Sequence, residues 1–224
     1  MNIRCGLLGR LVAKSQKSIY AWILDLHLPA IAAVSAGLIP VCINAAGSYV
    51  VKDISVTASS YWGLIDQDPQ NLVNGSGLSQ PIYALSPSGI LSRTISHDNS
   101  PWASRQWHTS SNDPQPWVRF DFGKPHDLSS VHVWNANQDN LTSRGVKTLD
   151  IQISTDGGIT YSSARAGVTL PQAIGNTGIF ATAIDLSSFN GVTNVLFNMR
   201  SNYGGDCAGL SEVQFIAKGA SELA

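Results

Sequence analysis

The chain has 224 residues, with 14 Lys and Arg against 15 Asp and Glu, and a formal net charge of −1. Residues 47–224 alone hold ten basic and fourteen acidic residues, a net charge of −4, without a cluster of Lys and Arg. This mild acidity argues against nucleic acid or an anionic lipid surface as the main partner. A segment of about 178 residues can bury the core of one domain.

The first 46 residues have the order of a secretory signal peptide. Basic residues come first, with no acid among the first 20, and an apolar stretch from Leu28 to Ile43 follows. The small residues at 44–47 then suit a signal peptidase. The apolar stretch is short for a membrane span, which needs ~20 residues. We therefore expect bacterial export, a cleaved signal, and a domain that is secreted or displayed at the cell surface. An uncleaved anchor is the alternative.

The rest of the chain alternates apolar and polar residues in short runs separated by Gly, Asn and Asp turns. Side chains of a strand point to opposite faces in turn, so these runs predict strands with one face on a core. Residues 60–116 lack this periodicity. A long irregular segment in a compact domain is usually either functional or held in place by other parts of the molecule. The pattern predicts one all-β antiparallel sandwich over residues 47–218, without a long helix, and a frayed tail at 219–224. The predicted strands are 50–59, 117–122, 130–136, 146–155, 178–185, 193–201 and 209–217.

One of these runs has a characteristic sequence. Trp-Val-Arg-Phe-Asp-Phe-Gly at residues 117–123 resembles the W-[IV]-x-F-D-L-G strand of discoidin domains, also called coagulation factor 5/8 C-type domains. Further segments fit this family in the same order along the chain, and together they cover residues 50–217. The resemblance implies a jelly-roll sandwich of about eight strands. It places the chain in the galactose-binding-like superfamily, which includes many bacterial carbohydrate-binding modules. The matching segments are 71–78, 131–137, 144–158, 201–206 and 209–213.

The resemblance also implies a structural calcium ion between an early loop and the last strand. The corresponding residues are Asn74, Ser76 and Glu212. Calcium takes six to eight oxygen ligands, largely from carboxylates and carbonyls. Asn74 stands where relatives often have Asp, which removes one negative charge. Glu212 lies in an apolar run, where a lone carboxylate needs either a cation or several donors. The alternative to calcium is a Glu212 that accepts backbone N–H bonds.

Aromatic side chains in loops are candidates for sugar binding, because an aromatic face packs on the apolar face of a pyranose. Tyr61, Trp62 and Trp102 lie in loop-like sequence, so we expect them to contact a ligand. Trp117 begins a predicted core strand, and Trp107 resembles the core-capping Trp of the family, so both are expected to be structural.

Polar candidates follow from the family, whose binding loops lie at one end of the sandwich. Arg, His and Asn side chains there can bond to sugar hydroxyls. Arg144 has a second interpretation, a salt bridge with a nearby acid or packing on Trp134. His108, His126 and His132 have no metal-ligand spacing. The polar candidates are His97, Asn135, Asn137, Arg144, Asn202 and Tyr203.

No catalytic signature is present in the sequence. A glycosidase needs two carboxylates that flank one bond, and no obvious pair remains once Asp121 is assigned to a strand and Glu212 to the ion. Neither a Gly-x-Ser-x-Gly elbow nor a His-Glu-x-x-His helix occurs. Cys207 is the single cysteine after residue 46, so it has no disulfide partner within the domain. It is a buried small side chain, an exposed thiol or an intermolecular link. We expect a secreted, non-catalytic module that binds a glycan or another cell-surface ligand. The alternative is an adhesive or structural surface protein with a protein partner.

Overall fold

A computed structural model describes residues 47–63, 67–80, 95–99 and 105–219. The chain divides into two compact units, 1–41 and 42–224, and all described residues belong to the second. The expected signal peptide, Trp102 and the tail after Gly219 lie outside the described residues.

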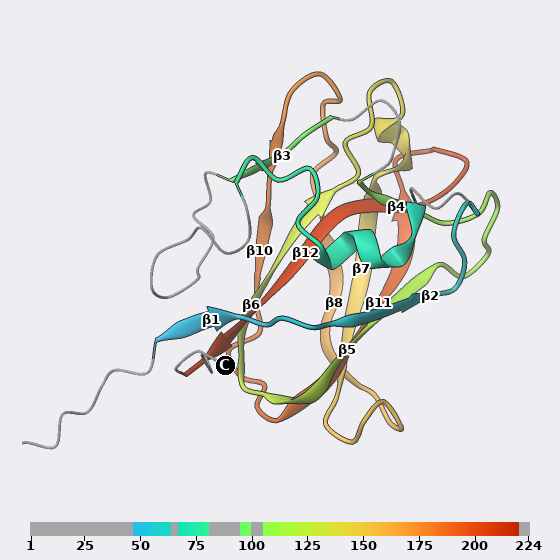
Figure 1. The fold of residues 1–224 in the computed structure, drawn as a ribbon. Helices are drawn as coiled ribbons and strands as arrows, with labels where there is room; N and C mark the ends of the chain where they lie inside the picture. Colours follow the sequence, from blue (N-terminus) through green and yellow to red (C-terminus); the bar gives the residue numbers. More distant parts are fainter. Residues whose placement is uncertain (1–46, 64–66, 81–94, 100–104, 220–224) are drawn as a thin grey trace, which may run out of the picture. The chain divides into compact units, whose positions relative to one another are not determined.

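Two antiparallel five-stranded sheets form the domain (Figure 1), as the sequence predicts for the fold class. Two short 3-10 turns lie wholly within the described ranges, η2 (Pro69–Val73) and η3 (Thr142–Arg144). The first sheet contains, in spatial order, β1 (Ser48–Val50), β12 (Gly209–Lys218), β6 (Leu128–Asn135) and β10 (Thr182–Asp185), with β4 (Trp107–His108) paired to β12. The second contains β2 (Ser55–Ala58), β5 (Trp117–His126), β11 (Val192–Asn202), β7 (Val146–Ser154) and β8 (Ser162–Thr169). A small third sheet pairs β3 (Ser96–His97) with β9 (Ile179–Phe180).

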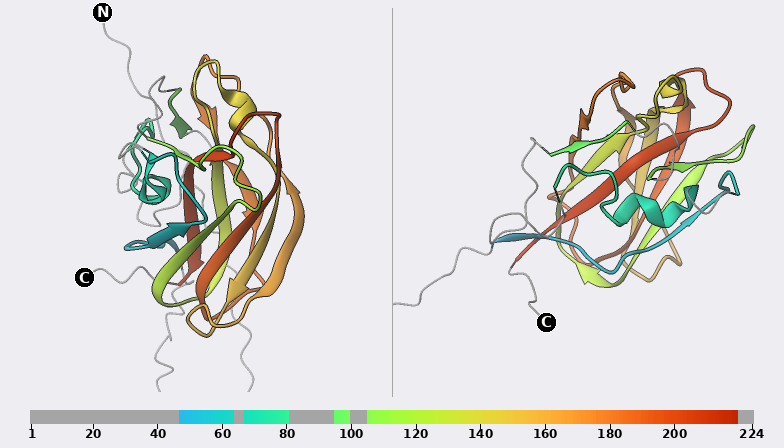
Figure 2. Two further views of the ribbon diagram at one scale, coloured as in Figure 1. Left: turned by 90° about the vertical axis from the view of Figure 1, so that its right-hand side faces the viewer. Right: turned by 45° about the horizontal axis from the view of Figure 1, so that its top comes forward.

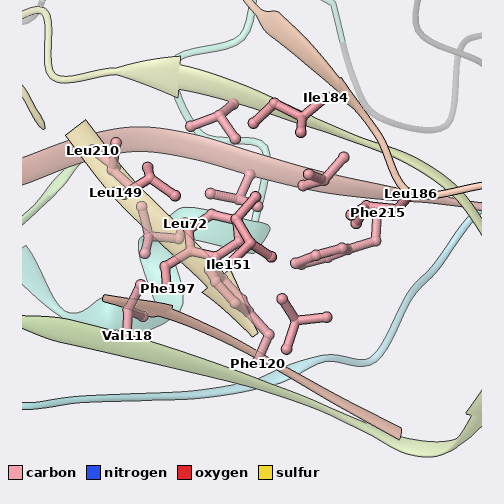
Figure 3. Packing of buried hydrophobic residues seen from close by; sticks show 14 of the residues in the cluster. Leu72, Val118, Phe120, Leu149, Ile151, Ile184, Leu186, Phe197, Leu210 and Phe215 are labelled. Atoms are coloured by element: carbon pink, nitrogen blue, oxygen red, sulfur yellow. The ribbon is translucent and has the colours of Figure 1, made fainter. Parts of the chain in front are cut away.

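The core lies between the two sheets, which Figure 2 shows edge-on. Three phenylalanines meet at its centre (Figure 3), Phe120 and Phe197 from one sheet and Phe215 from the other. The Phe120 ring centroid lies 5.2 Å from that of Phe197 and 5.0 Å from that of Phe215, both in edge-on geometry. All three side chains are fully buried. Burial of such rings is the main force that holds the sheets together, and edge-on contacts add to it.

The strand predictions are confirmed where alternation is strong and differ where it is weak. Residues 50–59 divide between β1 and β2, which belong to different sheets, so the chain crosses the sandwich between them. The predicted strand at 178–185 is likewise divided between β9 and β10. β8 was not predicted, because its side chains are mostly exposed and carry no apolar alternation. The irregular region 60–116 contains η2, β3 and β4.

The register of β12 defines the two ends of the sandwich. Its first residues pair with Trp107 and Asn135, whereas its last residue, Lys218, pairs with Ser48 of β1. The chain therefore enters through β1 and leaves through β12 at one end (Figure 1). The loops after β2, β4, β6 and β11 meet at the other end, which we call the loop end. In the described part of the chain, no helix has the length and apolarity needed to cross a membrane.

Candidate functional site

The loop end is held together by backbone hydrogen bonds between segments that are distant in the sequence. Trp62 N–H donates to the His108 carbonyl over 3.1 Å, and Asn112 N–H donates to the Asp206 carbonyl over 3.1 Å. Gly205 N–H donates to the Ser143 carbonyl over 2.9 Å. These bonds join the loops after β2, β4 and β11 with the turn η3, so side chains from all four segments are presented together at the loop end.

Trp62 and Arg144 form the centre of this surface. The Arg144 guanidinium carbon lies 5.2 Å from the centroid of the Trp62 ring, which is a cation–π contact. Arg144 Nε donates to Asp206 Oδ1 over 2.8 Å, and Nη2 donates to Oδ2 over 3.3 Å. The two hydrogen bonds from Arg144 lower the pKa of Asp206. Trp62 remains 38% exposed, and the neighbouring Tyr61 is 49% exposed. We call Tyr61, Trp62, Arg144 and Asp206 the aromatic platform.

A buried histidine lies close to this platform. His108 on β4 is fully buried, and neither ring nitrogen has a hydrogen-bond partner among the described residues. Burial lowers the pKa of His108 to about 4, and the positive charge of Arg144 acts in the same direction. Since both effects disfavour the imidazolium, His108 is neutral at neutral pH.

A cleft of about 290 Å³ adjoins the platform, between the β4–β5 loop and the β11–β12 loop. Asp113 and Asp206 both line it. The hydroxyls of Ser59 and Ser60 donate to Asp113 Oδ2 over 2.6 and 2.5 Å, and Gln115 N–H donates to Oδ1 over 3.1 Å. Ser59 and Ser60 directly precede Tyr61 and Trp62 in the chain. The platform and the cleft are therefore built from the same segments.

Three of the predicted polar candidates are buried beneath the loops. The ring nitrogens of His97 lie 3.0 Å from the carbonyl oxygens of Asp98 and Ser76. Asn135 donates to the Val146 and Pro171 carbonyls and accepts from the backbone N–H groups of Ala136 and Val146.

Asn137 connects three segments in the same way. It donates to the Asp98 and Thr177 carbonyls and accepts from Gly175 N–H. Because their polar atoms are engaged inside the fold, we place His97, Asn135 and Asn137 among the supports of the loops and leave them out of the candidate site.

Asn202 and Tyr203 also brace loops. The Asn202 amide donates to the Gly205 and Cys207 carbonyls, and its oxygen accepts from Gly204 N–H. The Tyr203 hydroxyl donates to the Leu170 carbonyl over 2.6 Å. These side chains are half-buried, so they shape the β11–β12 loop but present few free polar atoms to a ligand. The prediction for Trp102 lies outside the described residues.

The expected structural aromatics are buried or half-buried. Trp107 is fully buried and donates from Nε1 to the Ser60 carbonyl, whereas Trp117 at the start of β5 is half-buried. Trp134 is buried on the outer face of its sheet against Ile95. Arg144 makes the expected ion pair, with Asp206. Its aromatic partner is Trp62.

The residues expected to hold calcium lie close together. Glu212 is fully buried, and its two carboxylate oxygens accept from Gly75 N–H over 3.2 and 3.3 Å. Burial raises the pKa of Glu212 well above its usual value. The Ser76 hydroxyl is buried without a hydrogen-bond partner among the described residues. The Asn74 side chain is engaged within its own loop, with Asn71 and Ser76 N–H.

These features fit a calcium ion held by one carboxylate and by neutral oxygens. The under-satisfied Glu212 carboxylate and the unpaired Ser76 hydroxyl are the oxygen donors that a cation would engage. The described ranges contain no group of three or more His, Cys, Asp or Glu side chains that could hold a metal. Glu212 is the one acidic residue among the three predicted ligands, so Asn74 and Ser76 could add only neutral oxygens.

Some residues of the loop end were not identified from the sequence. Asp206 lies in the family-like segment 201–206 and Asp113 lies in the irregular region 60–116, but the sequence predicts neither as a site residue. The only local signal for either is an acid within a Gly- or Pro-containing loop, which is common in solvated turns. Cys207 is buried at the edge of the cleft, which agrees with the first of its three predicted alternatives. Burial raises the pKa of the Cys207 thiol to about 12.

Comparison with known proteins supports the fold. The chain is 13% identical to an F5/8 type C domain from Bacteroides fragilis, with a TM-score of 0.50 over 77% of this chain and 98% of that one. A family 89 glycoside hydrolase from Clostridium perfringens is 14% identical, with a TM-score of 0.51, and matches 78% of this chain but only 15% of its own length. The family 32 carbohydrate-binding module of NanJ from C. perfringens, solved with galactose, is 14% identical, with a TM-score of 0.47 over 75% of this chain and 98% of that one. No match was found among curated proteins.

The family itself is identified from the sequence of the domain. The model of the F5/8 type C domain matches residues 55–195, which is more than half of the chain. This range begins with β2 and ends within β11, so it includes Trp62 and Arg144 but neither β1 nor β12. The chain belongs to the F5/8 type C, or discoidin, domain family.

Proposed function

We propose that this domain is an exported, non-catalytic carbohydrate-binding module that binds its ligand at the aromatic platform. The observation that carries the proposal is the exposed Trp62 ring in contact with Arg144, which is fixed by Asp206. Tyr61, the next residue toward the N-terminus, is exposed as well. An aromatic ring packs against the apolar face of a sugar, and charged groups at its edge bond to the hydroxyls.

The geometry of Arg144 favours recognition because the side chain is ordered before a ligand arrives. Its side chain is only 14% exposed, and it is held by Trp62 on one side and by Asp206 on the other. Binding therefore does not have to restrict a freely moving arginine side chain. Such preorganisation generally increases affinity, because less conformational entropy is lost on binding. The predicted candidates Tyr61, Trp62 and Arg144 form this site together with Asp206.

The two carboxylates of the cleft, Asp113 and Asp206, are unsuited to glycoside hydrolysis. A glycosidase keeps one of two carboxyl groups protonated by raising its pKa. Here the hydrogen bonds from Arg144 lower the pKa of Asp206. Burial would raise the pKa of Asp113, but hydrogen bonds from Ser59, Ser60 and Gln115 outweigh it and lower the pKa. Neither residue is suited to act as a general acid, which supports a binding role.

A glycan array with purified residues 47–224 tests the proposal. We expect Trp62→Ala and Arg144→Ala each to weaken binding of the best glycan by about tenfold or more, the loss of a stacking or charge-assisted contact. Ile159→Ala is the matched control, because Ile159 is 83% exposed in the β7–β8 turn. A silent array together with the capture of one cell-surface protein would favour the alternative, an adhesive or structural protein.

Export and calcium belong to the same proposal. Mass spectrometry of the exported protein would show whether cleavage occurs near residue 46, as the order of basic, apolar and small residues predicts. We propose Glu212 and Ser76 as calcium ligands, with Asn74 shaping the loop that carries Ser76.

A further inference from the structure

The cleft beside the aromatic platform contains an unbalanced negative charge. Its charged lining residues are Asp113, Arg200 and Asp206. Arg200 is ion-paired with Asp150 on β7, and Asp206 is ion-paired with Arg144. Asp113 has no ion-pair partner among the described residues. Two of the three charges are thus neutralised from outside the cleft, and one carboxylate charge is left to a ligand.

Asp113 is fixed as an ionised acceptor. Two hydroxyls and one backbone N–H donate to it, so both of its oxygens are oriented by the protein. Hydrogen bonds to the charged form keep a carboxylate ionised, and this one keeps its charge at neutral pH. A carboxylate oxygen has more than one lone-pair direction, so a ligand donor can be added to this arrangement.

The remaining lining of the cleft combines polar and small apolar side chains. Thr109 and Asn112 contribute polar groups from the β4–β5 loop, and Ser201 and Asn202 contribute them from the end of β11. The apolar part of the lining comes from Pro114, Pro116, Met199 and Ala208. A volume of about 290 Å³ is at the lower end of the range for small-molecule sites. This space fits one ring-sized polar ligand better than a large apolar one.

We propose that this cleft binds a sugar residue that carries a free, protonated amino group, with its ammonium bonded to Asp113. The inference rests on the proposed function, because it extends the glycan bound at the aromatic platform into the neighbouring cleft. An anionic sugar would be repelled by the net charge, and a neutral sugar would leave that charge unpaired. An ammonium group bonded to a fixed carboxylate forms a charge-assisted hydrogen bond, the strong kind in proteins.

Continuity between the cleft and the platform favours a saccharide over a lysine-containing peptide. Ser59 and Ser60, which bind Asp113, lead directly into Tyr61 and Trp62. Asp206 lines the cleft and also fixes Arg144 on the Trp62 ring. One chain of sugars can therefore stack on the aromatic pair and place an adjoining residue beside Asp113.

The test compares a glucosamine disaccharide with its N-acetylated form by isothermal titration calorimetry at pH 6.5, with the whole domain. We expect the free amine to bind at least about tenfold more tightly, and Asp113→Asn to abolish this preference. Asp185→Asn is the matched control, since Asp185 is an exposed, ion-paired carboxylate on β10 and should leave the preference unchanged. If Asp113→Asn does not fold, raising the pH until the amine loses its proton should abolish the preference in the unaltered protein.

The outcomes separate the inference from the proposed function. Equal affinity for the two disaccharides, with binding lost in Trp62→Ala, would overturn the amino-sugar site and leave the platform intact. Binding of neither disaccharide, together with a silent glycan array, would overturn the proposed function itself. Equal binding of a lysine peptide and the glucosamine disaccharide would overturn the assignment to a sugar.

Discussion

His108 is a neutral histidine buried next to a charged site, and this makes the domain sensitive to acid. Its pKa is lowered from the usual 6.5 to about 4, chiefly by burial and then by Arg144. The folded state therefore binds fewer protons than the unfolded chain between these values. The stabilising effect is fully present above pH 6.5 and is lost as the pH falls toward 4.

We expect the free energy of unfolding to fall by roughly 3 kcal/mol between pH 6.5 and 4 on account of His108 alone. Urea unfolding at several pH values would measure the decline. His108→Gln, which cannot become protonated, should have a shallower slope. The remaining slope would include His97, whose pKa is also lowered by burial. An unchanged slope in His108→Gln would contradict the assignment of the acid sensitivity to this residue.

Among the elements, β8 differs most from the others in how it is held. It lies at the edge of its sheet, where β7 is its one partner among the described strands, and none of its residues is fully buried. β11 is central in the same sheet, between β5 and β7, and several of its side chains lie in the core. Local opening costs least where burial and pairing are least.

We expect hydrogen exchange of the β8 amides to be faster than that of β11 by roughly a hundredfold. Exchange measured by NMR or mass spectrometry on the folded domain would show this. β12, which is central in the other sheet and almost wholly buried, serves as the internal reference. Equal protection of β8 and β11 would mean that the edge strand is covered by something other than its own contacts.

The same contrast explains how much of the structure could be predicted from the sequence. Apolar and polar residues alternate along β5 and β11 because one face of each strand meets the core. This alternation predicts both strands from the sequence. β8 has no such face and was missed. At the loop end, Trp62 was predicted because it is an aromatic residue in loop-like sequence, and Arg144 was predicted from the family resemblance. His97 and Asn135 are polar residues too, but they lie buried where the loops pack on one another. Their burial depends on contacts between segments that are distant in the chain, which the local sequence does not reveal.

For the molecule as a whole, Glu212 connects the last strand to the early loop. If calcium binds there, it stabilises only the folded state, because the ligands come from segments far apart in the sequence. At calcium about 100-fold above its dissociation constant, we expect a chelator to lower the melting temperature by roughly 5–10 °C. Differential scanning fluorimetry with and without chelator measures this.

Glu212→Gln is the matched variant for this experiment. It keeps the shape of the side chain but removes the charge, so calcium should no longer raise its melting temperature. A melting temperature that does not respond to chelator in the unaltered protein would favour the alternative, a Glu212 held only by the Gly75 N–H.

The pairing of Ser48 with Lys218 has a practical consequence. Both connections to neighbouring polypeptide emerge side by side, and the length of β12, roughly 30 Å at ~3.3 Å per residue, separates them from Trp62 and Arg144. A fluorescent protein or an enzyme joined beside Ser48 or Lys218 would leave the proposed binding surface unobstructed. The domain could equally be inserted into a surface turn of a host protein, as a reporter module whose two attachment points need almost no spacer.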